Sequence, residues 1–115
     1  MARKVLKVLI ADDERIVREN MRQYIPWASM GMEVVDAVEN GALALDILKS
    51  VPVDIMLMDI RMPVMDGLEL LENIRALGLN VLVIVLSAYD QFEYAQKAIQ
   101  SRLVFEYVLK PVKRR

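Results

Sequence analysis

The stretch Asp54-Ile55-Met56-Leu57-Met58-Asp59 decides the fold of this chain, because four consecutive apolar residues lie between two acids. Pro52 precedes it and Ile60-Arg61-Met62-Pro63 follows it. A short apolar run without alternation, bounded by turn signals, predicts a strand that is buried on both faces. Such strands belong to parallel sheets covered by helices, and ligands bind at the carboxyl ends of those strands. Asp59 stands at that end, so we expect it to be the central functional residue.

Strand-like and helix-like patterns alternate outward from this stretch. Runs of branched aliphatic residues predict strands, and apolar residues at helical spacing predict helices. The predicted strands cover residues 5–11, 33–38, 54–59, 81–86 and 105–109, and the predicted helices cover 16–25, 42–50 and 67–77, with a fourth after residue 90. This alternation predicts an α/β fold with a parallel sheet and right-handed crossovers.

Turn and capping residues mark the ends of the predicted helices. Asp13 is a plausible N-cap of the first helix, and Pro26 ends that helix. Asp66-Gly67 opens the third helix, and Gly78 closes it as a C-cap glycine. Asp90 can cap the fourth helix.

Composition excludes several classes of protein. The 115 residues fit a single domain, and the balance of 15 Lys and Arg against 16 Asp and Glu favours no polyanionic partner. The chain has no cysteine and no histidine, which excludes disulfides, thiolate or imidazole metal sites and a Ser-His-Asp triad. No apolar run approaches the roughly 20 residues of a membrane span, and the basic start is no signal peptide. We therefore expect a cytoplasmic domain.

Polar residues fall where the predicted strands end. Asp12 and Asp13 end the first strand, Asp59 the third, Ser87 the fourth and Lys110 the fifth. In a parallel sheet these ends share one edge, so three carboxylates, a hydroxyl and an ammonium should converge there. Three close like charges are unfavourable unless a cation lies among them. Oxygen-only ligands indicate a hard ion, Mg²⁺ before Mn²⁺ or Ca²⁺.

This set of groups suits phosphoryl transfer onto a carboxylate. Aspartate is a covalent phosphoryl acceptor in known chemistry. The metal ion and Lys110 would neutralise charge on the phosphoryl oxygens, and the Ser87 hydroxyl would donate a hydrogen bond. Each residue taken alone is more often a turn former, a helix cap or a solvated side chain. Their joint occurrence at one sheet edge favours function.

The chain resembles the receiver domain of bacterial two-component response regulators. The resemblance runs over nearly the whole sequence and is carried, in order, by Val8-Leu9-Ile10-Ala11-Asp12-Asp13-Glu14, Met58-Asp59-Ile60-Arg61-Met62-Pro63-Val64-Met65-Asp66-Gly67, Leu86-Ser87-Ala88 and Leu109-Lys110-Pro111. Two further segments, Ile25-Pro26-Trp27 and the run from Ser87 to Ala95, are similar to the subgroup that carries an AraC-type DNA-binding output domain. The output would then be control of transcription.

The resemblance implies a fold and a metal site. The fold would be flavodoxin-like, with three layers and a five-stranded parallel sheet of order 2-1-3-4-5. Asp59 would be the phosphoacceptor, and Asp12, Asp13, Asp59 and the backbone carbonyl of Arg61 would hold Mg²⁺ as the cofactor.

The resemblance also implies a switch and a partner. Ser87 would bond the phosphoryl group and Lys110 would pair with it, while Tyr107 falls at the position of the family's switch aromatic. The Lys110-Pro111 bond is commonly cis in this family. A sensor histidine kinase would donate the phosphoryl group from a phosphohistidine. The chain would be no enzyme beyond its own phosphorylation and dephosphorylation, and it would reach DNA only through an output domain.

Two departures from the family pattern lead to further expectations. Only Val112-Lys113-Arg114-Arg115 follow Lys110-Pro111, where relatives have a fifth helix, so residues 1–115 would be a receiver domain that ends after its fifth strand. Apolar surface of strands one, four and five would then lie open, and we expect self-association as a dimer or through a swapped element. Arg102-Leu103-Val104 stand where relatives have an apolar residue, Gly and Ala, which affects the exit of the fourth helix.

Two other classes of function compete with the phosphoacceptor hypothesis. The first is a structural or engineered receiver-like module that self-associates without signalling. The second is a flavin-binding flavodoxin relative, which requires a Ser/Thr/Gly-rich phosphate loop after the first strand. Asp12-Asp13-Glu14 would repel a flavin phosphate, so the flavodoxin alternative is rejected. A phosphatase with separate substrates is disfavoured because no pocket beyond the acidic edge is predicted.

Overall fold

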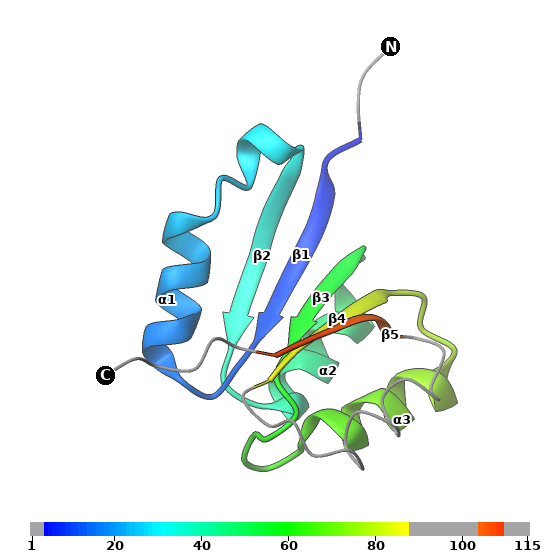
Figure 1. Ribbon diagram of the computed structural model, residues 1–115. Coiled ribbons are helices and arrows are strands. Elements are labelled where there is room, and N and C mark those ends of the chain that lie inside the picture. The colour runs from blue at the N-terminus through cyan, green and yellow to red at the C-terminus, as the bar shows by residue number, and fades with distance from the viewer. Residues whose placement is uncertain (1–3, 88–103, 110–115) are drawn as a thin grey trace.

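A five-stranded parallel sheet organises the chain (Figure 1). The computed structural model describes the backbone of residues 4–87 and 104–109 and the side chains of residues 4–86. Its elements are β1 (Leu6–Ala11), α1 (Arg15–Tyr24), the 3-10 helix η1 (Ala28–Met30), β2 (Met32–Val38), α2 (Gly41–Ser50), β3 (Ile55–Met58), α3 (Gly67–Leu77), β4 (Leu82–Ser87) and β5 (Val104–Leu109). The strands lie in the order β2-β1-β3-β4-β5.

The predicted α/β alternation is confirmed where the chain is described. The order 2-1-3-4 is as expected for the first four strands, and the backbone of β5 pairs in parallel with β4. The predicted fourth helix, its cap Asp90 and its exit at Arg102-Leu103 lie outside the described residues. So do Lys110, its bond to Pro111 and the tail that follows. No helix of the described ranges is long and apolar enough to cross a membrane.

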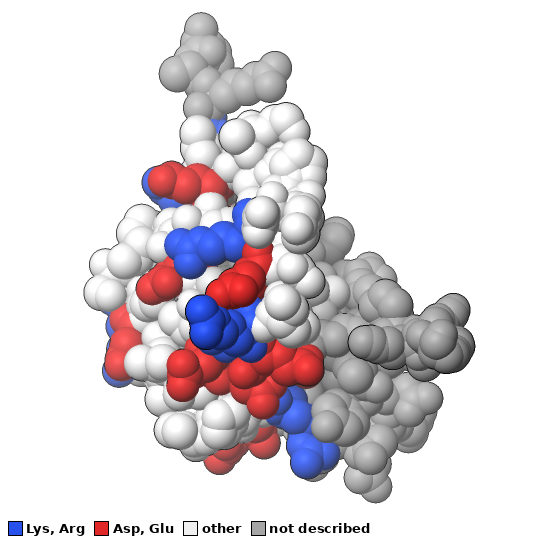
Figure 2. All heavy atoms as spheres, turned by 90° about the vertical axis from the view of Figure 1, so that its left-hand side faces the viewer, with Lys and Arg blue, Asp and Glu red and all other residues white. Residues whose placement is uncertain are grey.

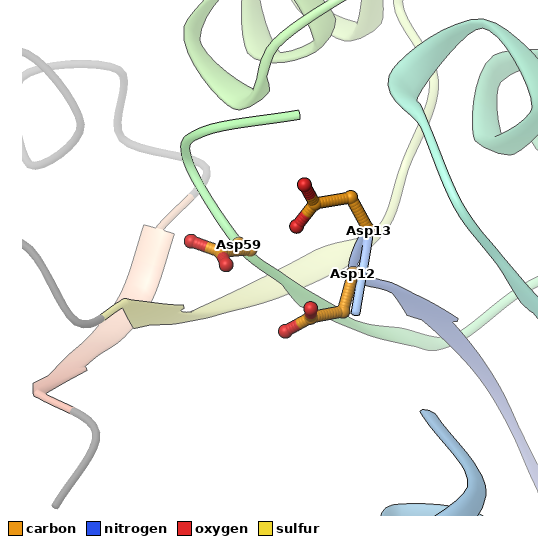
Figure 3. Close-up of side chains that lie close together, drawn as sticks. All are labelled: Asp12, Asp13 and Asp59. Carbon is orange, nitrogen blue, oxygen red and sulfur yellow. The ribbon is translucent and has the colours of Figure 1, made fainter. Parts of the chain in front are cut away.

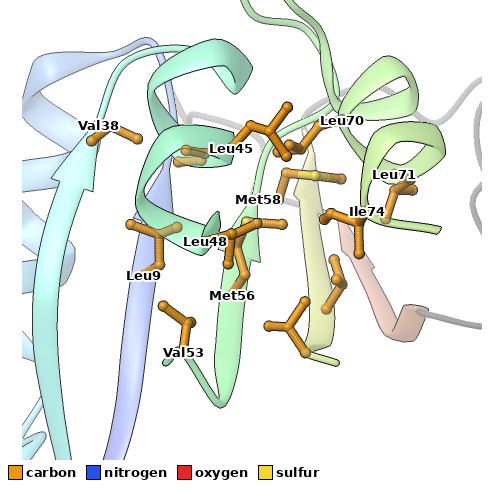
Figure 4. Close-up of a cluster of buried hydrophobic side chains, with 14 of the residues drawn as sticks. Leu9, Val38, Leu45, Leu48, Val53, Met56, Met58, Leu70, Leu71 and Ile74 are labelled. Atoms are coloured by element: carbon orange, nitrogen blue, oxygen red, sulfur yellow. The ribbon is translucent and has the colours of Figure 1, made fainter. Parts of the chain in front are cut away.

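The larger hydrophobic core lies between the sheet and the two helices α2 and α3 (Figure 4). Leu9 of β1 and Met56 of β3 face this side and are fully buried, as are Leu70 and Ile74 of α3. Successive residues of a strand point to opposite faces. Leu57 accordingly faces the other side of the sheet and is also buried. The prediction that the central strand is buried on both faces is confirmed.

The smaller core lies on the face that carries α1. Val8 and Ile10 of β1 are fully buried there, and Met21 of α1 and Trp27 pack against this cluster. The expectation that the apolar surface of the first strand lies open is therefore wrong, because these two side chains help to cover it. Leu82 of β4 is half exposed, and the side chains of β5 are outside the described residues.

The start of α1 differs from the prediction. Its N-cap is Glu14, not Asp13, and Glu14 makes no side-chain capping bond. The Asp12 carboxylate accepts the amide hydrogen of Glu14 at 2.9 Å. This local bond keeps residues 12–14 out of the helix, which begins one residue later than a cap at Asp13 would require. The helix ends before Ile25, because a residue that precedes proline is disfavoured in the helical conformation.

The predicted ends of α3 are confirmed, and α2 has a cap of the same kind. Asp66 and Glu69 form a capping box, in which each side chain accepts the other residue's backbone amide hydrogen. Gly78 ends α3 in the left-handed conformation with φ of 68°. The Asn40 side chain caps α2 by accepting from the Leu43 amide at 2.9 Å.

Candidate metal centre

Two backbone hydrogen bonds continue the sheet beyond the last residue of β1 and β3. The Asp12 amide donates to the Val38 carbonyl at 3.0 Å, and the Asp59 amide donates to the Ala11 carbonyl at 2.9 Å. Asp12 and Asp59 are thus fixed side by side where neighbouring parallel strands end. The topology of the sheet, not any local motif, makes them neighbours across 47 residues of sequence.

Three carboxylates meet at this edge of the sheet (Figure 3). Oxygen atoms of Asp12, Asp13 and Asp59 all lie within 4.8 Å of one another. Asp12 is 1% exposed and Asp59 is 5% exposed, whereas Asp13 reaches solvent. The prediction that these three acids converge is confirmed.

Backbone amides orient the two buried carboxylates. One Asp59 oxygen, Oδ1, accepts the Ile60 amide hydrogen at 2.7 Å, and Oδ1 of Asp12 accepts the Glu14 amide hydrogen at 2.9 Å. The donor to Asp59 is the amide of the next residue, and the donor to Asp12 is the amide of the residue two positions later. The turn after each strand therefore fixes the direction of its carboxylate.

The arrangement suits a divalent cation with oxygen ligands. Two carboxylate charges at 4.8 Å repel each other by about 3 kcal/mol at an effective dielectric constant of about 20. A divalent cation among them would replace this repulsion with attraction. The donors are all carboxylate oxygens, which hard cations such as Mg²⁺ and Ca²⁺ prefer. The residues present therefore fit a metal ion of this kind.

Two glycines bring the loop between β3 and α3 close to the site. A Cβ atom on Gly67 would lie 2.7 Å from the Asp59 carbonyl oxygen, and the Gly67 amide donates to the Ile60 carbonyl at 2.7 Å. A Cβ atom on Gly41 would lie 2.5 Å from the Met65 carbonyl oxygen, which accepts the Gly41 amide hydrogen. Only glycine allows either approach. The sequence interpretation placed Gly67 only at the start of the third helix and missed this packing.

The other predicted site residues are described to different extents. Arg61 lies in the loop that follows Asp59, and its side chain is exposed. Ser87 is the last residue of β4, two positions beyond Val85, which pairs with Met58 of β3. The backbone of Ser87 thus ends at the same sheet edge as Asp59. Tyr107 lies within β5, and its side chain, like that of Ser87, is outside the described residues, as is all of Lys110.

The chain is similar in sequence to one family of known proteins. Residues 8–115 match the family model described as "Response regulator receiver domain". The transcriptional regulatory protein HptR of Staphylococcus aureus is 42% identical over 108 residues, which cover 94% of this chain and 42% of HptR. The chain thus spans less than half of the length of such curated relatives.

Solved structures agree in fold. The REC domain of AraT, a response regulator from Geobacillus stearothermophilus, superposes with a TM-score of 0.82 at 46% identity, covering 95% of this chain and 84% of that one. A CheX–CheY–BeF3–Mg²⁺ complex from Borrelia burgdorferi contains a chain with a TM-score of 0.80 at 28% identity, covering 94% and 80%. These similarities confirm the flavodoxin-like receiver fold that the sequence predicted.

Proposed function

Because this chain belongs to the family of response regulator receiver domains, we propose that it accepts a phosphoryl group on Asp59 from a phosphohistidine of a sensor histidine kinase. The observation that carries the proposal is the cluster of Asp12, Asp13 and Asp59, whose carboxylate oxygens lie within 4.8 Å of one another. A cluster of this kind provides both a nucleophile and a site for Mg²⁺. A structure of a relative's complex with Mg²⁺ and BeF3 supports the choice of ion.

In the proposed transfer, an Asp59 carboxylate oxygen attacks phosphorus. The bond between phosphorus and the imidazole nitrogen of the kinase breaks, and the imidazole leaves with the electron pair. The hydrogen bond from the Ile60 amide to Oδ1 at 2.7 Å fixes the plane of the Asp59 carboxylate before the reaction. Mg²⁺ bound at the cluster would neutralise charge on the phosphoryl oxygens.

Four further residues take roles that the family resemblance implies. The backbone carbonyl of Arg61 would complete the protein ligands of Mg²⁺. Ser87 would donate a hydrogen bond to the phosphoryl group, and Lys110 would pair with it. Tyr107 would change its side-chain position with Ser87. The backbone placement of Ser87 at the carboxyl end of β4 supports its assignment.

The proposed output is control of transcription in the cytoplasm. The matching region of HptR belongs to a transcriptional regulatory protein, which supports this output. The AraC-type subgroup that the sequence suggested is part of the proposal. DNA would be contacted by an output domain outside residues 1–115. The chain would catalyse no reaction on a separate substrate.

One experiment tests the phosphoacceptor proposal directly. Incubation with Mg²⁺ and acetyl phosphate, a small phosphodonor, should add the mass of one phosphoryl group, as measured by intact-protein mass spectrometry. Asp59→Asn should abolish the adduct. Asp46→Asn, which changes an exposed acid on α2, should leave it unchanged. An unmodified wild-type protein, or an adduct that survives Asp59→Asn, would refute the proposal.

A second candidate function, a self-associating module, is favoured by one surface. Leu82 of β4 is 50% exposed and lies on the α1 side of the sheet with Ile84 and Leu86, because alternate residues of a strand face the same side. We propose that this face forms a homodimer. Sedimentation velocity at several concentrations should show a dimer that Leu82→Gln weakens and Leu43→Gln, at an exposed position on α2, does not. A wild-type protein that stays monomeric at high concentration excludes this interface.

A further inference from the structure

A side chain of α1 reaches back to the metal centre. The Nη1 atom of Arg18 donates a hydrogen bond of 2.9 Å to the backbone carbonyl oxygen of Asp12. Arg18 is half-buried, unlike Arg15 and Arg22 on the same helix, which are exposed. The sequence interpretation gave Arg18 no role, because its position in a helical pattern is that of an ordinary surface residue.

The Arg18 bond acts together with two other hydrogen bonds of Asp12 in the described part of the chain. The Asp12 amide donates to Val38 of β2, its carboxylate accepts from the Glu14 amide, and its carbonyl accepts from Arg18. The first bond anchors Asp12 to the sheet, and the other two set the direction of the chain as it leaves β1. Asp13 lies within this turn, so the same bonds constrain its backbone.

The packing of α1 depends on partly buried side chains such as Met21, which contacts the smaller core. None of its residues is buried, and Ile16 and Tyr24 point largely into solvent. Side chains of both charge signs cover the face that α1 occupies (Figure 2), and one pair on α1 is the exposed Arg15–Glu19 bridge of 2.9 Å. A partly buried, charge-assisted hydrogen bond is stronger than an exposed ion pair of this kind. The Arg18 bond is therefore well placed to fix α1 and the β1–α1 turn relative to each other.

We propose that Arg18 is a positioning residue of the metal centre, which holds Asp12 and Asp13 in the orientation that binds Mg²⁺. The role rests on the proposed function, since it assumes that the acidic cluster is a Mg²⁺ site. Arg18 acts on the ligands through the Asp12 carbonyl and does not itself touch the metal ion. Such outer partners of metal ligands typically change metal affinity by about 10-fold to 100-fold.

Positioning and electrostatics predict opposite effects when Arg18 is replaced. The guanidinium is a positive charge near a cation site, so its charge alone would weaken Mg²⁺ binding, and its removal would tighten it. Loss of the hydrogen bond would loosen the turn and weaken binding. The direction of the change in Mg²⁺ affinity therefore distinguishes the positioning role from a simple charge effect.

The test is isothermal titration calorimetry of Mg²⁺ with the whole chain at constant ionic strength. Arg18→Met should weaken Mg²⁺ binding by about 10-fold. Arg18→Lys keeps the positive charge and an ammonium group that can donate a hydrogen bond, so its Mg²⁺ affinity should lie between those of Arg18→Met and wild type. Arg22→Met removes the same charge from an exposed position on the last turn of α1 and should leave the affinity unchanged. Thermal unfolding without metal, measured on each variant, shows whether the fold is retained.

Each outcome decides the question. If Arg18→Met binds Mg²⁺ as tightly as wild type, or more tightly, the positioning role is overturned even where its stability has fallen. If Arg18→Met does not fold, Arg18→Lys carries the test, and unchanged affinity in that variant overturns the role. If the wild-type chain binds no Mg²⁺, the proposed metal centre fails and the role of Arg18 fails with it. If wild type binds Mg²⁺ and both Arg18 variants bind it more weakly, the result supports the metal centre and the positioning role of Arg18.

Discussion

Replacement of Val64 by glycine should stabilise the protein, although Val64 lies in the loop beside the candidate metal centre. Val64 has φ of 69° and is the one non-glycine residue with positive φ in the described part of the chain. The Met65 amide donates to the Pro63 carbonyl at 2.7 Å, which closes a three-residue turn around Val64. Turns of this kind with positive φ are rare and strained, and a β-branched residue fits them poorly.

The magnitude follows from three terms. Release of the backbone strain should contribute about 1–3 kcal/mol. Greater freedom of glycine in the unfolded chain costs about 0.5–1 kcal/mol. Because Val64 is 81% exposed, loss of its side chain forfeits only about 0.3–0.6 kcal/mol of burial. With each term taken at the middle of its range, the net effect is a stabilisation of about 0.8 kcal/mol, or a rise in Tm of about 3–5 °C.

Equilibrium urea unfolding of Val64→Gly, with Val64→Ala as the control, measures this effect. Alanine loses the β-branch but keeps the Cβ atom that makes positive φ unfavourable, so Val64→Ala should gain less than Val64→Gly. Equal stability of the two variants, or a loss of stability in Val64→Gly, would refute the assignment of strain to this residue.

Two further predictions concern the support of the site and the opposite edge of the sheet. Gly67→Ala places a Cβ atom 2.7 Å from the Asp59 carbonyl oxygen, so it should lower the free energy of unfolding by about 1–3 kcal/mol; an unchanged urea midpoint would contradict the close packing. The Lys7 backbone amide, followed by the Lys4 side chain, lowers the pKa of Asp54 below its ordinary value of 3.8. A lowered folded-state pKa contributes stability that is present above pH 3.8 and is lost as pH falls through the folded value. Asp54→Asn should therefore be less stable than wild type at neutral pH and approach it below pH 3.8, as followed by urea unfolding across that range; a constant difference would show that the ionised carboxylate is not responsible.

Much of the fold was predictable from local patterns. The apolar run before Asp59 predicted a doubly buried strand, and β3 has that burial. Asp66 and Gly78 predicted both ends of α3, since capping depends on residues within one turn of the helix. The meeting of Asp12, Asp13 and Asp59 was also predictable, because parallel strands place their carboxyl ends at one edge.

Other features depended on contacts that no local pattern reports. The cap of α1 moved from Asp13 to Glu14 because the Asp12 carboxylate takes the Glu14 amide. Val8 proved to be buried because Met21 and Trp27, from later segments, pack on that face.

The sequence by itself determined the strands and the three α-helices of the described residues, and which acids end the strands, because strand burial, helix periodicity and capping are properties of neighbouring residues. Only the tertiary structure decided that Arg18 holds the Asp12 carbonyl, that Gly67 lies against Asp59 and that Val64 takes a positive φ. These features arise where separate segments must fit together in space, and the geometry of that fit is set by the whole sheet and its loops.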